Sequence, residues 1–148
     1  MITIKQFVVN EFQVNTYVLS DETCEAVIID GAIKFSNEKD AILDYIKTNK
    51  LKVKYIINTH GHIDHICGNK KLKEEFGVPV LMNSEDFFLV ESAESHARGY
   101  GLSIDTPPIP DVNISDNSTI EFGNSVLKCI QVPGHTPGSI CFYSESDA

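Results

Sequence analysis

The stretch "NTHGHIDH", residues 58–65, begins at the last residue of the apolar run "VKYIIN" and holds three of the five histidines in the chain. The apolar run is short and rich in β-branched residues, which predicts a buried strand. In α/β sheets, binding sites usually lie at the carboxyl ends of such strands. The stretch therefore predicts a functional site at the edge of an α/β sheet.

The residue types in this stretch point to a metal. His60 and His62 are two positions apart, so an extended backbone directs both imidazoles to the same side. Asp64 and His65 follow at the start of a predicted helix. Crowding three imidazoles and a carboxylate without a cation would be costly. The spacing predicts a metal site, and it suits two adjacent ions.

A second histidine motif, "VPGHTPGS" at residues 132–139, places His135 between two Pro-Gly pairs in a predicted turn. Taken alone, His135 is best interpreted as a surface residue. Beside the first cluster it becomes the expected third imidazole. Three histidines with an open fourth position are typical of catalytic zinc. His96 is interpreted as a solvated loop histidine, with a substrate-facing lid residue as the alternative.

Hydrophobic patterning predicts an α/β fold with helices packed on a mixed sheet. The expected strands are residues 2–9, 15–20, 25–30, 53–58, 78–82, 118–122, 125–132 and 140–144. The expected helices are residues 37–49, a segment from the histidine cluster to Phe76 that ends at Gly77, and residues 84–92. Residues 92–118 are rich in Pro, Asp, Asn and Ser and are expected to form a long surface loop.

Composition excludes several classes of protein. The formal charge of −9 argues against nucleic acid as a partner, because phosphate binding needs clustered Lys and Arg. No apolar run approaches the roughly 20 residues of a membrane span, and the start "MITIKQFVVN" lacks the order of a signal peptide. The four cysteines show no close pairing and are expected to be reduced, mostly buried thiols. We therefore expect a cytoplasmic protein.

Taken in order, "VNTYVL", "VIIDGA", "THGHIDH" and "IEFGNSVLKCIQVPGHTPGSICFY" resemble the metallo-β-lactamase superfamily, most closely its glyoxalase II-like (hydroxyacylglutathione hydrolase-like) members. The resemblance implies an αββα sandwich. It implies one metal on His60, His62 and His135, and a second that Asp64 and His65 help to bind, with Asp64 serving catalysis.

The resemblance also gives Asp30 a role. Asp30 matches an aspartate that supports the ligands by hydrogen bonds without touching the metal. An aspartate that ends a strand before a glycine turn is the alternative interpretation.

The function implied is that of a metal-dependent hydrolase in which a metal-bound hydroxide attacks a small thioester or ester. Two zinc ions are expected in the intact enzyme, and iron or manganese also suits these ligands. Two alternatives stay open. One is an oxidoreductase of the mononuclear iron, persulfide-oxidising type, and the other is a non-catalytic metal-binding remnant.

The end of the chain departs from the family pattern. A further bridging aspartate and a final histidine have no counterpart, because the sequence stops at "ESDA". Residues 1–148 are therefore expected to form one domain that holds the first half of the fold and the start of the second. Such a truncated form should bind one ion or fewer and be inactive. Its uncovered apolar face should favour homo-oligomers.

Overall fold

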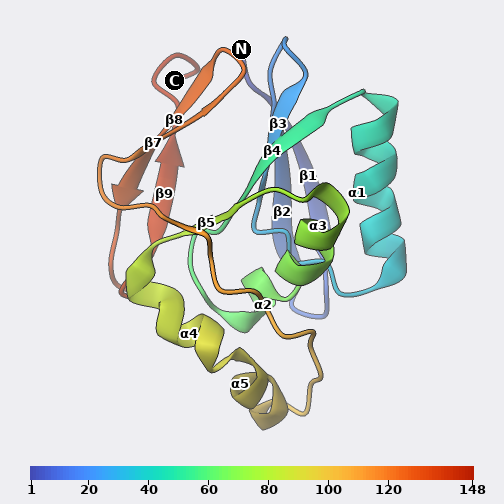
Figure 1. The fold of residues 1–148 in the computed structure, drawn as a ribbon, viewed down its shortest axis with the longest axis vertical. Coiled ribbons are helices and arrows are strands. Elements are labelled where there is room, and N and C mark those ends of the chain that lie inside the picture. Colours follow the sequence, from blue (N-terminus) through green and yellow to red (C-terminus); the bar gives the residue numbers. More distant parts are fainter.

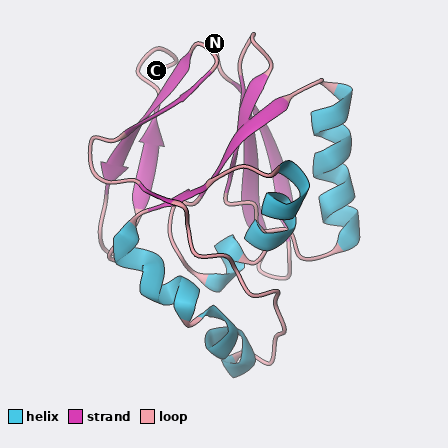
Figure 2. Ribbon diagram, viewed as in Figure 1, coloured by secondary structure: helices cyan, strands magenta, loops and turns pink.

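The computed structural model describes all residues from 1 to 148, which form two packed sheets with helices on one outer side (Figures 1 and 2). The strands of the larger sheet are β1 (Thr3–Val9), β2 (Val14–Ser20), β3 (Glu25–Ile29), β4 (Lys52–Ile57), β5 (Val80–Met82) and β6 (Val112–Asn113). The helical segments are α1 (Ser36–Thr48), α2 (Ile63–Ile66), α3 (Asn69–Phe76), η1 (Ser84–Asp86), α4 (Phe87–Glu91) and α5 (Ala93–Gly99).

Strand direction in the larger sheet brings two chain segments together at one edge. The strands lie in sequence order, antiparallel from β1 to β3 and parallel from β3 to β6. The register pairs Ile29 with Ile57, so β3 and β4 end side by side. Asp30 therefore begins its turn next to Asn58, at the carboxyl ends of two parallel strands.

The smaller sheet is antiparallel and consists of β7 (Thr119–Phe122), β8 (Ser125–Gln131) and β9 (Ile140–Tyr143). Buried and exposed residues alternate along β7 and for most of β8, the pattern of strands with one face in a core. The turn between β7 and β8 lies at Gly123–Asn124, between the two predicted strands 118–122 and 125–132, and Gly123 has a φ of +55°. The β8–β9 connection carries His135.

The central strands of the larger sheet are buried on both faces, and β3 shows this through its alternating side chains. Ala26 and Ile28 belong to a core shared with α1 and α3. Val27 and Ile29 face the opposite way, into a core shared with β7, β8 and β9. The order of layers is helices, sheet, sheet, as seen from α1 across to β7 in Figure 1. This agrees with the predicted α/β class and with the first three layers of an αββα sandwich.

Two predicted elements differ in the structure. The segment expected as a loop contains α5 and β6, because Ala93 and Ala97 lie one helical turn apart and bury against α2 and α4. The helix expected after the histidine cluster is divided into α2 and α3. Gly68 lies between them, and a Cβ there would come within 2.0 Å of the Gly31 carbonyl oxygen. The predicted stop at Gly77 is confirmed by its φ of +62°.

None of the helices has the length and apolar character that a membrane crossing requires. The four cysteines form no disulfide. Cys67 and Cys129 are buried, but Cys24 and Cys141 are exposed, so the expectation of mostly buried thiols holds for only two of the four.

Candidate metal centre

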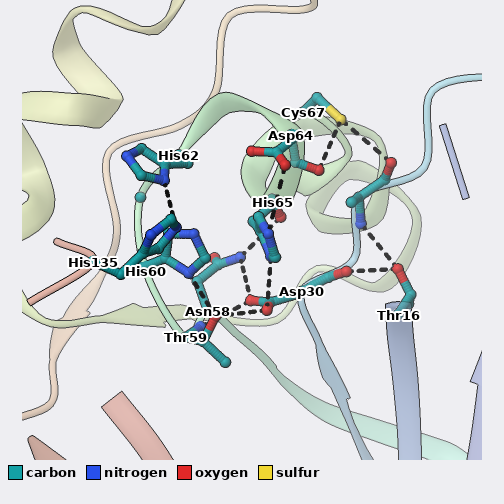
Figure 3. Close-up of polar contacts among 12 residues, drawn as sticks. Thr16, Asp30, Asn58, Thr59, His60, His62, Asp64, His65, Cys67 and His135 are labelled. Atoms are coloured by element: carbon teal, nitrogen blue, oxygen red, sulfur yellow. Dashed lines mark hydrogen bonds and ion pairs between the residues drawn. The ribbon is translucent and has the colours of Figure 1, made fainter. Parts of the chain in front are cut away.

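Three connections converge on the candidate site (Figure 3). Asp30 follows β3, and His60, His62, Asp64 and His65 follow β4. His135 comes from the other sheet, in the turn between β8 and β9. The structure therefore gathers all six side chains that the sequence singled out.

His60, His62 and His135 form a compact group of imidazoles. One ligand atom from each lies within 4.8 Å of the others. The ring centroids are 4.9 Å apart for His60 and His62 and 4.8 Å apart for His60 and His135. The His62 Nδ1 and His135 Nε2 atoms are 3.0 Å apart. Three nitrogens this close, from neighbouring loops, match a three-histidine metal site.

The tautomer of His60 follows from its neighbour Thr59. The Thr59 hydroxyl donates to Asp30 Oδ2 at 2.6 Å, so its oxygen is left to accept from His60 Nδ1–H at 2.8 Å. The lone pair of His60 is then on Nε2. That atom is buried and has no hydrogen-bond partner. A buried acceptor without a partner is costly, and a bound cation would satisfy it. The donor set thus fits a metal ion.

Asp30 holds His65 by a direct hydrogen bond and His60 through Thr59. Its carboxylate accepts from the Thr59 N–H at 2.8 Å, from Asn58 at 3.4 Å and from His65 Nδ1 at 3.0 Å. The Asp30 backbone has a φ of +49°, and Thr16 donates to its carbonyl oxygen at 2.6 Å. Asp30 also lies within ligand distance of His60 and His65. Because donors already occupy both carboxylate oxygens, the contacts suit orientation of ligands better than ligation.

The pKa values of His60, His62 and His65 are shifted in different directions. Burial lowers the pKa of His60 to about 4, and nearby His65 adds to this effect. Burial and the neighbouring His135 also lower the pKa of His62. Burial acts to lower the pKa of His65, but the hydrogen bond and charge of Asp30 outweigh it and raise that pKa. His60 and His62 are therefore neutral at pH 7, which is the ligating form.

Asp64 lies next to this group. Its carboxylate is 3.6 Å from His65 Nε2. It belongs to neither of the two clusters of three donor groups within ligand distance. The Asp64 carbonyl oxygen accepts from Asn10 at 2.9 Å, which fixes the start of α2 against the β1–β2 turn.

A cavity of about 640 Å³ opens beside the imidazoles. His62 and Asp64 form part of its wall, and Phe12 and Tyr100 meet edge to face at 6.4 Å between ring centroids. His96 also lines the cavity, from α5 rather than from a loop. His96 is exposed to solvent at this position, which agrees with a solvated histidine as well as with a substrate-facing one.

The sequence interpretation missed Thr59 and the aromatic pair Phe12 and Tyr100. For Thr59, the available signal was its position directly before His60, at the end of a strand. No local pattern could have paired Phe12 with Tyr100, because they lie 88 residues apart in sequence and meet only in the fold.

Comparison with known proteins places the chain in a family. The sequence profile described as "Metallo-beta-lactamase superfamily" matches residues 9–147. An uncharacterized protein of Aquifex aeolicus is 38% identical over 96% of this chain and 65% of its own length. The hydroxyacylglutathione hydrolase GloC of Haemophilus influenzae is 32% identical over 90% of this chain and 62% of its own length.

Solved structures of similar fold support the same family. The crystal structure of TTHA1623 in a di-iron-bound form has a TM-score of 0.83 and 28% identity, over 97% of this chain and 68% of that one. The chain spans less than two thirds of the length of the curated relatives described above. With the matched profile, the shared fold and the converging histidines, the chain belongs to the metallo-β-lactamase superfamily.

Proposed function

We propose that this chain carries the metal centre of a hydrolase that cleaves a small thioester or ester. His60, His62 and His135 would hold one divalent ion. Asp64 and His65 would contribute to a second, and Asp30 would orient His65 directly and His60 through Thr59. The observation that carries the proposal is the buried His60 Nε2, which has no partner and lies beside the ligand atoms of His62 and His135.

A divalent ion at these nitrogens would supply a Lewis acid that polarises a carbonyl and lowers the pKa of water from 15.7 to about 7. Zinc suits three imidazoles well, while iron and manganese suit mixed imidazole and carboxylate donors. The similar structure TTHA1623 is described as di-iron-bound, which supports iron as a candidate here beside zinc.

The cavity suits the acyl part of a small substrate. Phe12, Leu89 and Tyr100 offer apolar surface, and His96 offers a polar group on the same wall. Pockets that combine apolar walls with a few polar groups are typical of small-molecule sites. The name of the relative GloC, a hydroxyacylglutathione hydrolase, supports a thioester as the substrate class.

We assign proton transfer to Asp64. Its carboxylate lines the cavity and is partly exposed, so it can reach water and substrate. Held 3.6 Å from His65 Nε2, it is placed to accept a proton from an attacking water and to pass it to the leaving thiolate or alkoxide. The four free thiols support a reducing, cytoplasmic location.

Metal content in two histidine variants tests the site. His62→Ala removes one of the three imidazoles and should abolish tight metal binding. His96→Ala changes a histidine of the cavity wall outside the three-imidazole group and should keep the bound metal. Elemental analysis after dialysis against a weak chelator measures both. Equal metal loss in the two variants would contradict the ligand assignment.

Activity separates the candidate reactions. The 148-residue chain and a form extended to the length of its relatives are assayed with acyl-glutathione thioesters after metal loading. We expect hydrolysis by the extended form and little or none by residues 1–148. Oxygen uptake with a persulfide, without thioester hydrolysis, would replace the proposal with the oxidoreductase. Metal binding by the extended form without either reaction would favour a non-catalytic role.

A further inference from the structure

Asp86 is a fully buried carboxylate with three hydrogen-bond donors and no cationic partner. It ends η1, away in sequence from both histidine motifs. Its Oδ2 accepts from the Gly61 N–H at 2.9 Å and from the Thr136 hydroxyl at 2.6 Å. Its Oδ1 accepts from the Gly138 N–H at 2.7 Å. Burial of a charge is tolerated only where hydrogen bonds compensate it, as they do here.

These donors belong to the two loops that present the metal ligands. Gly61 lies between His60 and His62, and Thr136 follows His135. One carboxylate group thus bridges a loop of the larger sheet and a turn of the smaller sheet. The bridge joins the loop that carries His62 to the turn that carries His135, and the nearest ring nitrogens of these two histidines are 3.0 Å apart.

Two glycines allow this close approach. A Cβ on Gly138 would lie 2.8 Å from the Asp86 carboxyl carbon, and a Cβ on Gly61 would lie 3.0 Å from the Asp86 carbonyl oxygen. Neither glycine has a positive φ. A Cβ would therefore overlap Asp86 at Gly138 and crowd it at Gly61, so both glycines matter here for space and not for backbone conformation.

We propose that Asp86 is a positioning residue that sets the separation of His62 and His135 and thereby the metal affinity of the site. This inference rests on the proposed metal centre, because it assigns Asp86 no contact with metal or substrate. A carboxylate suits the role since its two oxygens accept from all three donors, whereas an amide would turn its NH₂ group, itself a donor, towards at least one of them.

The test is metal affinity, measured with Zn²⁺ in competition with a chromophoric chelator, and the absorption spectrum of the Co²⁺-loaded protein. Asp86→Asn turns one acceptor oxygen into a donor that faces an N–H. We expect affinity to fall about 10- to 100-fold, as for other residues that support metal ligands, and the Co²⁺ spectrum to change. Thr136→Val should lower affinity by a smaller factor, and Thr136→Ser, which keeps the hydroxyl, should bind like the wild type.

Asp21→Asn is the matched control. Asp21 is also a buried aspartate that joins the two sheets, through Asn124 and Ser125, and it accepts a further hydrogen bond from Thr23 in its own turn. It lies at the turn between β2 and β3, at the end of the sheets opposite α2 (Figure 1). It should lose stability and keep wild-type metal affinity, which separates positioning from general weakening of the fold.

The outcomes are distinct. Wild-type affinity in both Asp86→Asn and Thr136→Val would overturn the role of Asp86 and leave the metal centre standing. Equal loss of affinity in Asp21→Asn would overturn it as well. Absence of metal binding by the wild-type chain would overturn the proposed centre and this role together. If Asp86→Asn does not fold, the Thr136→Val and Thr136→Ser pair decides.

Discussion

At the scale of single residues, the candidate centre depends on which nitrogen of each imidazole is free. Thr59 and Asp30 hold the Nδ1 atoms of His60 and His65, which leaves the Nε2 atoms for a ligand. The sequence predicts the imidazoles from their spacing. It does not predict the tautomers, because these depend on hydrogen bonds between Asp30, which follows β3, and the residues that follow β4.

Thr59→Val tests this arrangement. Valine keeps the shape of threonine but removes the hydroxyl that joins His60 to Asp30. We expect metal affinity to fall about 10-fold with little change in fold, because the His60 ring loses its fixed tautomer. Chelator competition gives the affinity. Thr119→Val, on the exposed side of β7, is the control. Identical affinities for the two variants would contradict the role of Thr59.

At the scale of elements, strands were easier to predict than the helices around the site. Strands such as β8 show alternating burial, and α1 has its buried Ile42 and Ile46 on one face. In contrast, α5 buries only small alanines among polar residues, so its pattern resembles that of a loop. The break between α2 and α3 depends on the packing of Gly68 against another segment, which no local pattern shows.

The end of α3 gives a prediction about stability. Gly77 has a φ of +62° and would have open space around a Cβ, so Gly77→Ala acts through backbone strain alone. We expect a loss of about 1 kcal/mol in the free energy of unfolding. Gly99, at the end of α5, is equally open but has no positive φ. Gly99→Ala should be neutral or stabilising by up to about 1 kcal/mol. Urea unfolding compares them, and equal losses would contradict the strain argument.

At the scale of the whole molecule, the site lies between two sheets. His60 and His62 follow a strand of the larger sheet, and His135 follows a strand of the smaller one. A metal ion bound by all three should stabilise the packing of one sheet on the other. Ile4 and Val8 on β1 are exposed apolar side chains. They agree with the expected self-association, which stays a prediction.

Metal should therefore stabilise the fold as a unit. A Zn²⁺ concentration of 100 times Kd should raise the free energy of unfolding by about 2.7 kcal/mol. In His135→Ala the increase should be mostly lost, because the remaining ligands come from one sheet. Denaturant unfolding with and without Zn²⁺ measures both. An undiminished increase in the variant would show that His135 is not a ligand.

The second contact between the sheets gives a dependence on pH. Burial acts to raise the pKa of Asp21, but hydrogen bonds from Thr23, Ser125 and Asn124 lower it to about 2. A lowered carboxyl pKa contributes stability above the unfolded value of about 4, and this contribution is lost as pH falls towards 2.

Asp21→Asn should therefore be less stable than the wild type at pH 6, by about 1–3 kcal/mol for a buried hydrogen-bonded group. The difference should narrow between pH 4 and pH 2, where the wild-type carboxylate becomes protonated. Unfolding curves at several pH values measure it. A difference that stays constant across this range would contradict an ionised Asp21.

Periodicity and motif spacing are local properties of the chain, and they were enough to predict the fold class, most strand positions and the donor types of the candidate site. Tertiary structure alone decided that His135 meets His62, that Thr59 links His60 to Asp30, and that Asp86 joins both loops. Most of these contacts join residues that are far apart in sequence. The link through Thr59 also depends on the direction in which its hydroxyl hydrogen points. Only the packing of two sheets brings them within bonding distance.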